Sequence, residues 1–191
     1  AALRRISASG VGLGLAWGRR AFIQLPAGDT VIPDGYLRIT RSGTRIRGAA
    51  AMEEGGNAEG GGGIPGQGVA SWATRIVGKI DVSGAKGVVV QGVSISNPTG
   101  DGVGAHSGCS LLLRDCEVAK CHGFGISVTW SDTDVDVVAC RVHHNGQVGV
   151  YAKNTSVRVR VLHTDVHHNQ RSGIMAVGGA AIDVYAHGKA G

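Results

Sequence analysis

Aromatic residues, proline and long apolar runs are scarce in this chain of 191 residues. Phe, Trp and Tyr make up 4% of the sequence and there are 4 prolines, a composition typical of short aliphatic strands joined by tight turns. No apolar run reaches the roughly 20 residues of a bilayer-spanning helix, so we expect no membrane span. Glycine is abundant, with 33 residues but no collagen-like period, and a hydrophobic fraction of 42% argues against a disordered chain.

Cysteine is also scarce. The 4 cysteines match neither a disulfide framework nor a zinc-binding spacing. We therefore expect no metal site, and the cysteine usage favours a reducing intracellular compartment.

Positive charge is concentrated at the beginning of the sequence. The formal net charge is +5, but residues 1–50 hold eight arginines against two aspartates, and the remainder is nearly neutral. An arginine-rich segment attracts polyanions, yet no aromatic residues for base stacking are interleaved with it. We therefore expect no nucleic-acid partner.

A repeat of 23 to 24 residues organises the second half of the chain. Four Gly-apolar pairs show the period, namely Gly102-Val103, Gly125-Ile126, Gly149-Val150 and Gly173-Ile174. Several apolar columns keep this register, among them Val90, Leu113, Val137 and Val161, and also Ile95, Val118, Val142 and Val166. The turn before each pair is predicted to hold Pro98, Cys121, Asn145 and Asn169.

Each repeat contains three short stretches in which apolar and polar residues alternate, as in strands with one buried face. One unit is too small to bury its own apolar face, so stacked units must form a continuous core. The sequence therefore predicts an all-β fold, a right-handed parallel β-helix of about five to six coils. Cys116 and Cys140 are expected to be neighbours across coils, where a disulfide is conceivable but buried thiols are commoner.

The β-helix is predicted to extend over residues 29–191, where 29–49 forms an opening coil around a Pro-Asp-Gly turn. Residues 51–70 are a Gly-rich stretch, which we interpret as a surface loop insertion. Residues 1–28 are expected to cap the end of the helix. The sequence opens without Met and stops within the pattern at HGKAG, so we interpret it as part of a longer protein or assembly.

Coils such as CRVHHNGQVGVYA (140–152) and TDVHHNQRSGIMA (164–176) resemble those of the pectin-lyase-like superfamily of right-handed β-helix proteins. The resemblance covers about residues 29–191 and implies the fold. It implies no single activity, because that superfamily contains polysaccharide lyases, hydrolases and epimerases together with non-catalytic modules. The active-site signatures of the alginate epimerases, the polygalacturonases and the pectate lyases are absent.

Alternation places Asp134, Asp136, Arg158 and Arg160 on one exposed face, with Arg114 beside them. If the protein is an enzyme, these four residues are the catalytic candidates. The carboxylates then act as acid and base or hold Ca²⁺, and the arginines bind a uronate carboxylate. The alternative is a cross-strand ladder of opposite charges that favours solubility.

Histidines form the second candidate cluster, in which His143 and His144 recur one coil later as His167 and His168. Stacked imidazoles can bind a transition metal or transfer protons. Duplication of the repeat explains the pattern equally well, and we take His143 and His167, together with Arg114, as binding residues.

Two functions fit these patterns. The first is a non-catalytic β-helix module that presents a flat charged surface to a protein or a polysaccharide. The second is a uronan lyase or epimerase that uses the exposed Asp, Arg and His side chains. The absence of a recognisable catalytic set favours the first.

Overall fold

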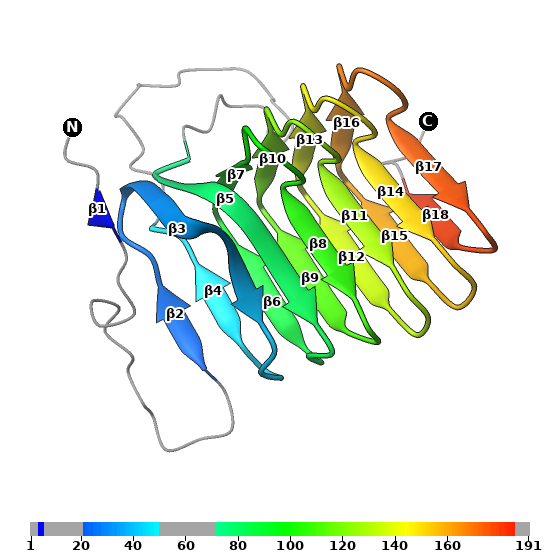
Figure 1. The fold of residues 1–191 in the computed structure, drawn as a ribbon, viewed down its shortest axis with the longest axis horizontal. Helices are drawn as coiled ribbons and strands as arrows, with labels where there is room; N and C mark the ends of the chain where they lie inside the picture. Colours follow the sequence, from blue (N-terminus) through cyan, green and yellow to red (C-terminus); the bar gives the residue numbers. More distant parts are fainter. Residues whose placement is uncertain (1–3, 6–20, 50–71, 186–191) are drawn as a thin grey trace, which may run out of the picture.

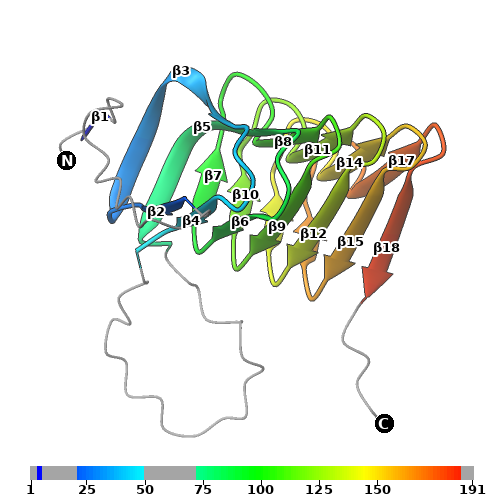
Figure 2. The same ribbon diagram turned by 90° about the horizontal axis from the view of Figure 1, so that it is seen from below.

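The computed structural model describes residues 4–5, 21–49 and 72–185, and every regular element within these ranges is a β-strand. The chain winds into a solenoid of about 6 turns whose coils stack along one axis (Figure 1). Each strand pairs in parallel with its equivalents in the coils on either side, and the coils follow one another in sequence order along the axis (Figure 2). The prediction of an all-β parallel solenoid is confirmed.

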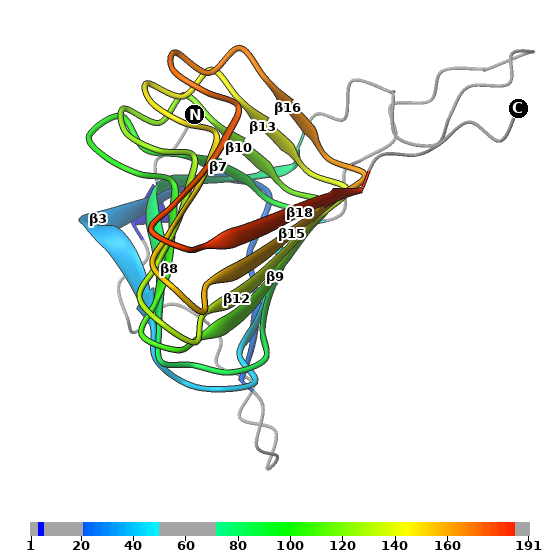
Figure 3. The same cartoon turned by 90° about the vertical axis from the view of Figure 1, so that its right-hand side faces the viewer.

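Seen along the axis, the strands form three faces (Figure 3). The β8–β17 face consists of β8 (Val103–His106), β11 (Ile126–Thr129), β14 (Val150–Lys153) and β17 (Ile174–Val177). The β6–β18 face consists of β6 (Val88–Gln91), β9 (Ser110–Arg114), β12 (Asp134–Val138), β15 (Arg158–Leu162) and β18 (Ala181–Tyr185). The β7–β16 face consists of β7 (Ser94–Ser96), β10 (Glu117–Ala119), β13 (Arg141–His143) and β16 (Asp165–His167).

The first described coils are less regular than the later ones. β2 (Phe22–Gln24) pairs with β4 (Arg45–Arg47), and β4 pairs with β6, so both extend the β6–β18 sheet. The long strand β5 (Thr74–Ser83) pairs with both β7 and β8 and thereby joins two faces. β3 (Gly28–Ile39) pairs with β5 and with the short β1 (Arg4–Arg5).

The predicted Pro-Asp-Gly turn does not separate two strands, because residues 33–35 lie inside β3. The register of β3 against β5 shifts between Val31 and Tyr36, because residues 32–35 of β3 lie opposite the single residue Gly78 of β5. Extra residues in one strand of a pair bend that strand without ending it. Alternation on both sides of a turn residue is therefore compatible with one continuous strand.

Stacked aliphatic columns form the core, in the register that the repeat predicts. Val90, Leu113, Val137 and Val161 are aligned across β6, β9, β12 and β15, and each is at most 1% exposed. A second column of Ile95, Val118, Val142 and Val166 follows the β7–β16 face. Burial of these side chains is the main stabilising contribution, because no single coil encloses a core.

The turn column differs from the prediction at one position. Backbone hydrogen bonds align Asn97, Cys121 and Asn145: the N–H groups of His122, Gly146 and Gln170 donate to their carbonyls at 2.8, 2.8 and 2.9 Å. Asn97 therefore occupies the position predicted for Pro98. Asn97 follows β7 one residue sooner than Cys121 follows β10, and one more residue separates it from Gly102. The two differences cancel, so the 23- to 24-residue period of the Gly-apolar pairs does not reveal the shift.

Most of the predicted cap (1–28) and all of the predicted Gly-rich insertion (51–70) lie outside the described residues. No described segment forms a helix with the length and apolarity needed to cross a membrane.

Candidate functional site

The predicted catalytic residues lie on the outer surface of the β6–β18 face. Asp134 is opposite Arg158, and Asp136 is opposite Arg160, in the parallel pairing of β12 with β15. The intervening Val135 and Val137 are at most 1% exposed, which fixes the outward direction of their neighbours. The structure therefore brings the four charged side chains together as alternation predicts.

Only one of the two Asp–Arg pairs forms an ion pair within the described residues. Arg160 donates from Nε to Asp136 Oδ1 at 2.6 Å and from its terminal nitrogen to Oδ2 at 2.7 Å. These hydrogen bonds, and then the negative charge of Asp136, raise the pKa of Arg160. Each Asp136 carboxylate oxygen therefore accepts one hydrogen bond from Arg160, and the pair is bidentate.

Arg114 lies at the end of β9, opposite Gln91 and Val138. Its side chain is exposed, and it occupies the next outward column rather than that of Asp136. The Asp/Arg candidates and Arg114 therefore share one face, but the structure provides no contact among all five side chains.

The predicted histidine cluster is present as four imidazoles at the edge of the β7–β16 face. His143 stacks on His167 with 4.9 Å between ring centroids, and His144 stacks on His168 at 5.1 Å. Within each coil the two rings meet edge to face, with Nδ1 atoms 2.8 Å apart in one pair and 2.6 Å in the other. Each Nδ1 contact can hold only one proton, so one ring of each pair must accept.

The surroundings of His167 oppose its protonation. Burial lowers the pKa of His167, and the charges of His143 and His168 lower it further. Glu117 is 3.2 Å from His143 Nε2 and provides the one carboxylate contact of the cluster within the described residues. No group of three or more His, Cys, Asp or Glu side chains with metal-site geometry occurs in ranges 21–49 and 72–185.

A second charged cluster, which the sequence analysis did not single out, lies at the first coils of the β8–β17 face. Asp81 is 4% exposed and contacts Lys79 at 2.9 Å, His106 at 3.4 Å and Arg38 at 3.5 Å. Burial alone would raise the pKa of Asp81, but the Lys79 hydrogen bond and the nearby positive charges outweigh it, and the pKa is lowered. Gly104 leaves the space that Lys79 occupies, because an added Cβ would lie 2.7 Å from Lys79 Nζ.

The four cysteines are free and buried. Burial raises the pKa of Cys109 and of Cys121 to about 11. Cys116 and Cys140 are neighbours as predicted, and a hydrogen bond to Cys116 together with burial holds the pKa of Cys140 well above its ordinary value. A reactive cysteine needs an accessible thiolate. These four thiols are buried and form part of the core instead.

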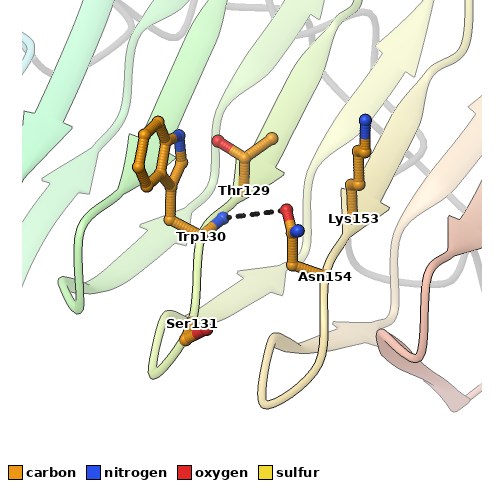
Figure 4. A pocket seen from close by; sticks show the side chains of 5 residues that line it. All are labelled: Thr129, Trp130, Ser131, Lys153 and Asn154. Atoms are coloured by element: carbon orange, nitrogen blue, oxygen red, sulfur yellow. Dashed lines mark hydrogen bonds between the residues drawn. The ribbon is translucent and has the colours of Figure 1, made fainter.

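The corner between β11 and β12 forms a pocket of 370 Å³ that the sequence analysis missed. Its lining includes Thr129, Trp130, Lys153 and Asn154. Trp130 is 66% exposed and lies in the turn with a φ of 70°, where its backbone N–H donates to Asn154 Oδ1 at 3.4 Å. Figure 4 shows the indole and the Lys153 amine on either side of Thr129, with all three side chains directed the same way.

This pocket adjoins an aromatic pair on the same face. Phe124, just before β11, stacks on Tyr151 of β14 with 4.5 Å between centroids and 12° between planes. Tyr151 is opposite Ser127, and Lys153 is opposite Thr129. Three aromatic side chains and several hydroxyl groups thus share the outer surface of β11 and β14, in a chain with only 4% aromatic residues.

Comparisons with known proteins agree with this architecture. A family model described as a right handed beta helix region matches residues 74–187, which is more than half of the chain. No curated protein and no solved structure gives a significant match.

Proposed function

Because the chain belongs to the right-handed β-helix family, its outer faces are the surfaces where a ligand can bind, and we propose that it is a non-catalytic module that binds a glycan. The binding surface in this proposal is the aromatic face, which we define as Phe124, Ser127, Thr129, Trp130, Tyr151, Lys153 and Asn154 on and beside β11 and β14.

The exposed Trp130 side chain carries the proposal. A large indole that is 66% exposed gains little from folding, whereas one side of a sugar ring is apolar and can cover an aromatic ring. The polar groups around it suit the hydroxyl groups of the same sugar: the Thr129 hydroxyl, the Asn154 amide and the Lys153 amine line the pocket. Aromatic surface with a few convergent polar groups is typical of small-molecule binding sites.

The geometry of the Asp/Arg candidates supports a binding role over a catalytic one. A general acid or base must be free to exchange a proton with substrate. Asp136 instead accepts two short hydrogen bonds from Arg160, and the surrounding strand is part of a regular sheet. The pair therefore fits the ladder of opposite charges on a flat surface.

Binding can be measured with a panel of neutral and acidic oligosaccharides by calorimetry and tryptophan fluorescence. We expect Trp130→Ala to weaken binding by about tenfold or more, which corresponds to roughly 1.4 kcal/mol, and Trp130→Phe to retain most of it. Tyr36→Ala is the matched control, because Tyr36 is also an exposed aromatic residue but lies outside the aromatic face. Full binding by Trp130→Ala would contradict the assigned face, and no binding across the panel would contradict a glycan ligand.

The enzyme alternative has its own test. We expect no change in the products of uronic-acid polymers incubated with the protein and Ca²⁺. Product formation that is lost in Asp136→Ala and Arg160→Ala, while both variants remain folded, would establish a lyase or epimerase instead.

A further inference from the structure

The turns that precede β11, β14 and β17 line a second, open pocket of 670 Å³ at the opposite edge of the β8–β17 face. Its lining residues include nitrogen-bearing side chains from three successive coils: Lys120, His122, His144, Gln147, Gln170 and Arg171. We infer that this cationic pocket binds an acidic group of the ligand, through carboxylate, sulfate or phosphate oxygens. The inference rests on the proposed function, because it adds a negative charge to the glycan that the aromatic face recognises.

The hollow itself follows from the stacking of the turns. Backbone hydrogen bonds place His122, Gly146 and Gln170 in one column, and Gly123, Gln147 and Arg171 in the next. Gly146 has no room for a side chain, because an added Cβ would overlap the carbonyl oxygen of His122. The glycine therefore lets the two turns approach closely, and it lines the pocket together with the polar side chains around it.

The positive charge of the pocket is not neutralised within the described residues. No carboxylate there lies within ion-pair distance of Lys120 or Arg171, and no Asp or Glu lines the pocket. Lys120 and Arg171 carry fixed charges, while the imidazole and amide groups can add N–H donors. Charge-assisted hydrogen bonds from such groups are the stronger ones that anions accept.

Two carboxylates on neighbouring elements, Asp101 and Glu117, accept hydrogen bonds within the solenoid. Asp101 Oδ1 accepts the backbone N–H of Phe124 at 2.9 Å. Glu117 accepts the Ser94 hydroxyl at 2.6 Å and contacts His143 at 3.2 Å. Neither carboxylate forms an ion pair with Lys120 or Arg171, so both cations are available to an external anion.

The pocket is continuous with the aromatic face along the chain. The turn that carries Lys120 and His122 leads within two residues to Phe124, and β11 then leads to Trp130. A ligand that lies along β11 would contact the cationic pocket at one end and the indole at the other. This arrangement suits an oligosaccharide with an acidic substituent better than a neutral one.

The test uses a matched pair of oligosaccharides, one neutral and one carboxylated or sulfated, with inorganic sulfate as a third probe. We expect the intact protein to bind the acidic form more tightly. The double variant Lys120→Gln/Arg171→Gln should lose this preference by about tenfold or more and bind the neutral form unchanged. Sulfate should shift the backbone amide resonances of His122 and Gln147, and should compete with the acidic form.

Arg45→Gln/Arg47→Gln is the control, because it removes the same charge from exposed arginines of β4, which belong neither to the pocket nor to the Asp/Arg candidates. An equal loss in this control, or no preference for the acidic form, would overturn the anion site while leaving glycan binding intact. If no oligosaccharide binds, the proposed function fails. Sulfate-induced shifts at His122 and Gln147 then decide the anion site separately.

Discussion

At the residue scale, side chains other than glycine occupy left-handed backbone positions at the corners of the coils. Lys120, His144 and His168 form one such column, with φ of 57°, 54° and 51°. This conformation costs about 1 kcal/mol or more for a residue with a Cβ, and the flanking parallel strands offset that cost. The corners can therefore display long polar side chains, such as the histidines and Lys120, where glycine would leave a bare turn.

Asn145 provides the clearest test at this scale. Its side chain is fully buried, donates to Val118 O at 3.2 Å and to Asn169 Oδ1 at 2.9 Å, and accepts from Cys121 N at 3.1 Å. We expect Asn145→Ala to lower the free energy of unfolding by about 2–4 kcal/mol, because buried backbone groups lose their partners. Urea unfolding followed by circular dichroism measures the change.

Asn169→Ala is the control for this ladder. Asn169 is partly exposed, so water can replace some of its hydrogen bonds, and a smaller loss is expected. Equal effects of the two substitutions would show that the buried position of Asn145 contributes nothing.

At the element scale, each strand sorts its side chains strictly between the core and the surface. β9 illustrates this with adjacent leucines, since Leu113 is fully buried whereas Leu112 points outward and is partly exposed. We expect Leu113→Ala to cost about 2–5 kcal/mol of unfolding free energy, because it opens a cavity between Val90 and Val137. Leu112→Ala is the matched control in thermal unfolding and should cost less than half as much; similar costs would contradict the assigned orientation of β9.

The same strict alternation explains why the strands and their columns could be predicted from the sequence. Val90, Leu113, Val137 and Val161 recur at a fixed period because each packs on its equivalent in the next coil. Loop residues obey no such constraint, and the predictions for loops were less accurate. The turn column holds Asn97 where Pro98 was predicted, and the Pro-Asp-Gly stretch lies within β3. The Asp136–Arg160 pair was predictable from register, but its two short hydrogen bonds depend on side-chain rotamers.

At the scale of the whole molecule, the 23- to 24-residue repeat alone could not predict the aromatic face or the cationic pocket. Trp130 occurs in a single coil, and its relation to Lys153 depends on which corner of the solenoid the two residues share. The cationic pocket likewise combines side chains from three coils, from Lys120 in the first to Arg171 in the third. An exposed tryptophan within a turn was the one sequence signal that could have indicated the site.

Stability of the whole solenoid should depend on pH through His167. The pKa of His167 is lowered in the folded protein by burial and by neighbouring imidazoles, so the unfolded chain takes up its proton first as the pH falls below about 6.5. The contribution of His167 is complete above that pH and is lost as the pH falls through the lower folded pKa. We expect the loss to be at most about 1 kcal/mol, because solvent screens the partly exposed ring.

Unfolding free energies measured between pH 7.5 and pH 5 test this expectation. His167→Gln should reduce the fall in stability over this range, whereas His122→Gln, outside the stack, should leave it unchanged. An identical pH profile for the intact protein and His167→Gln would refute the coupling.

The parallel in-register stacking has a consequence for how such a surface can evolve. Each coil contacts only its two neighbours, and HHN at 143–145 and again at 167–169 shows that adjacent coils tolerate the same sequence. Duplicating one 24-residue unit in the gene would lengthen every face by one strand spacing, about 4.8 Å, without redesigning the existing coils. If the proposed function holds, the length of glycan that the surface binds is adjustable in discrete steps, and each step is the thickness of one coil.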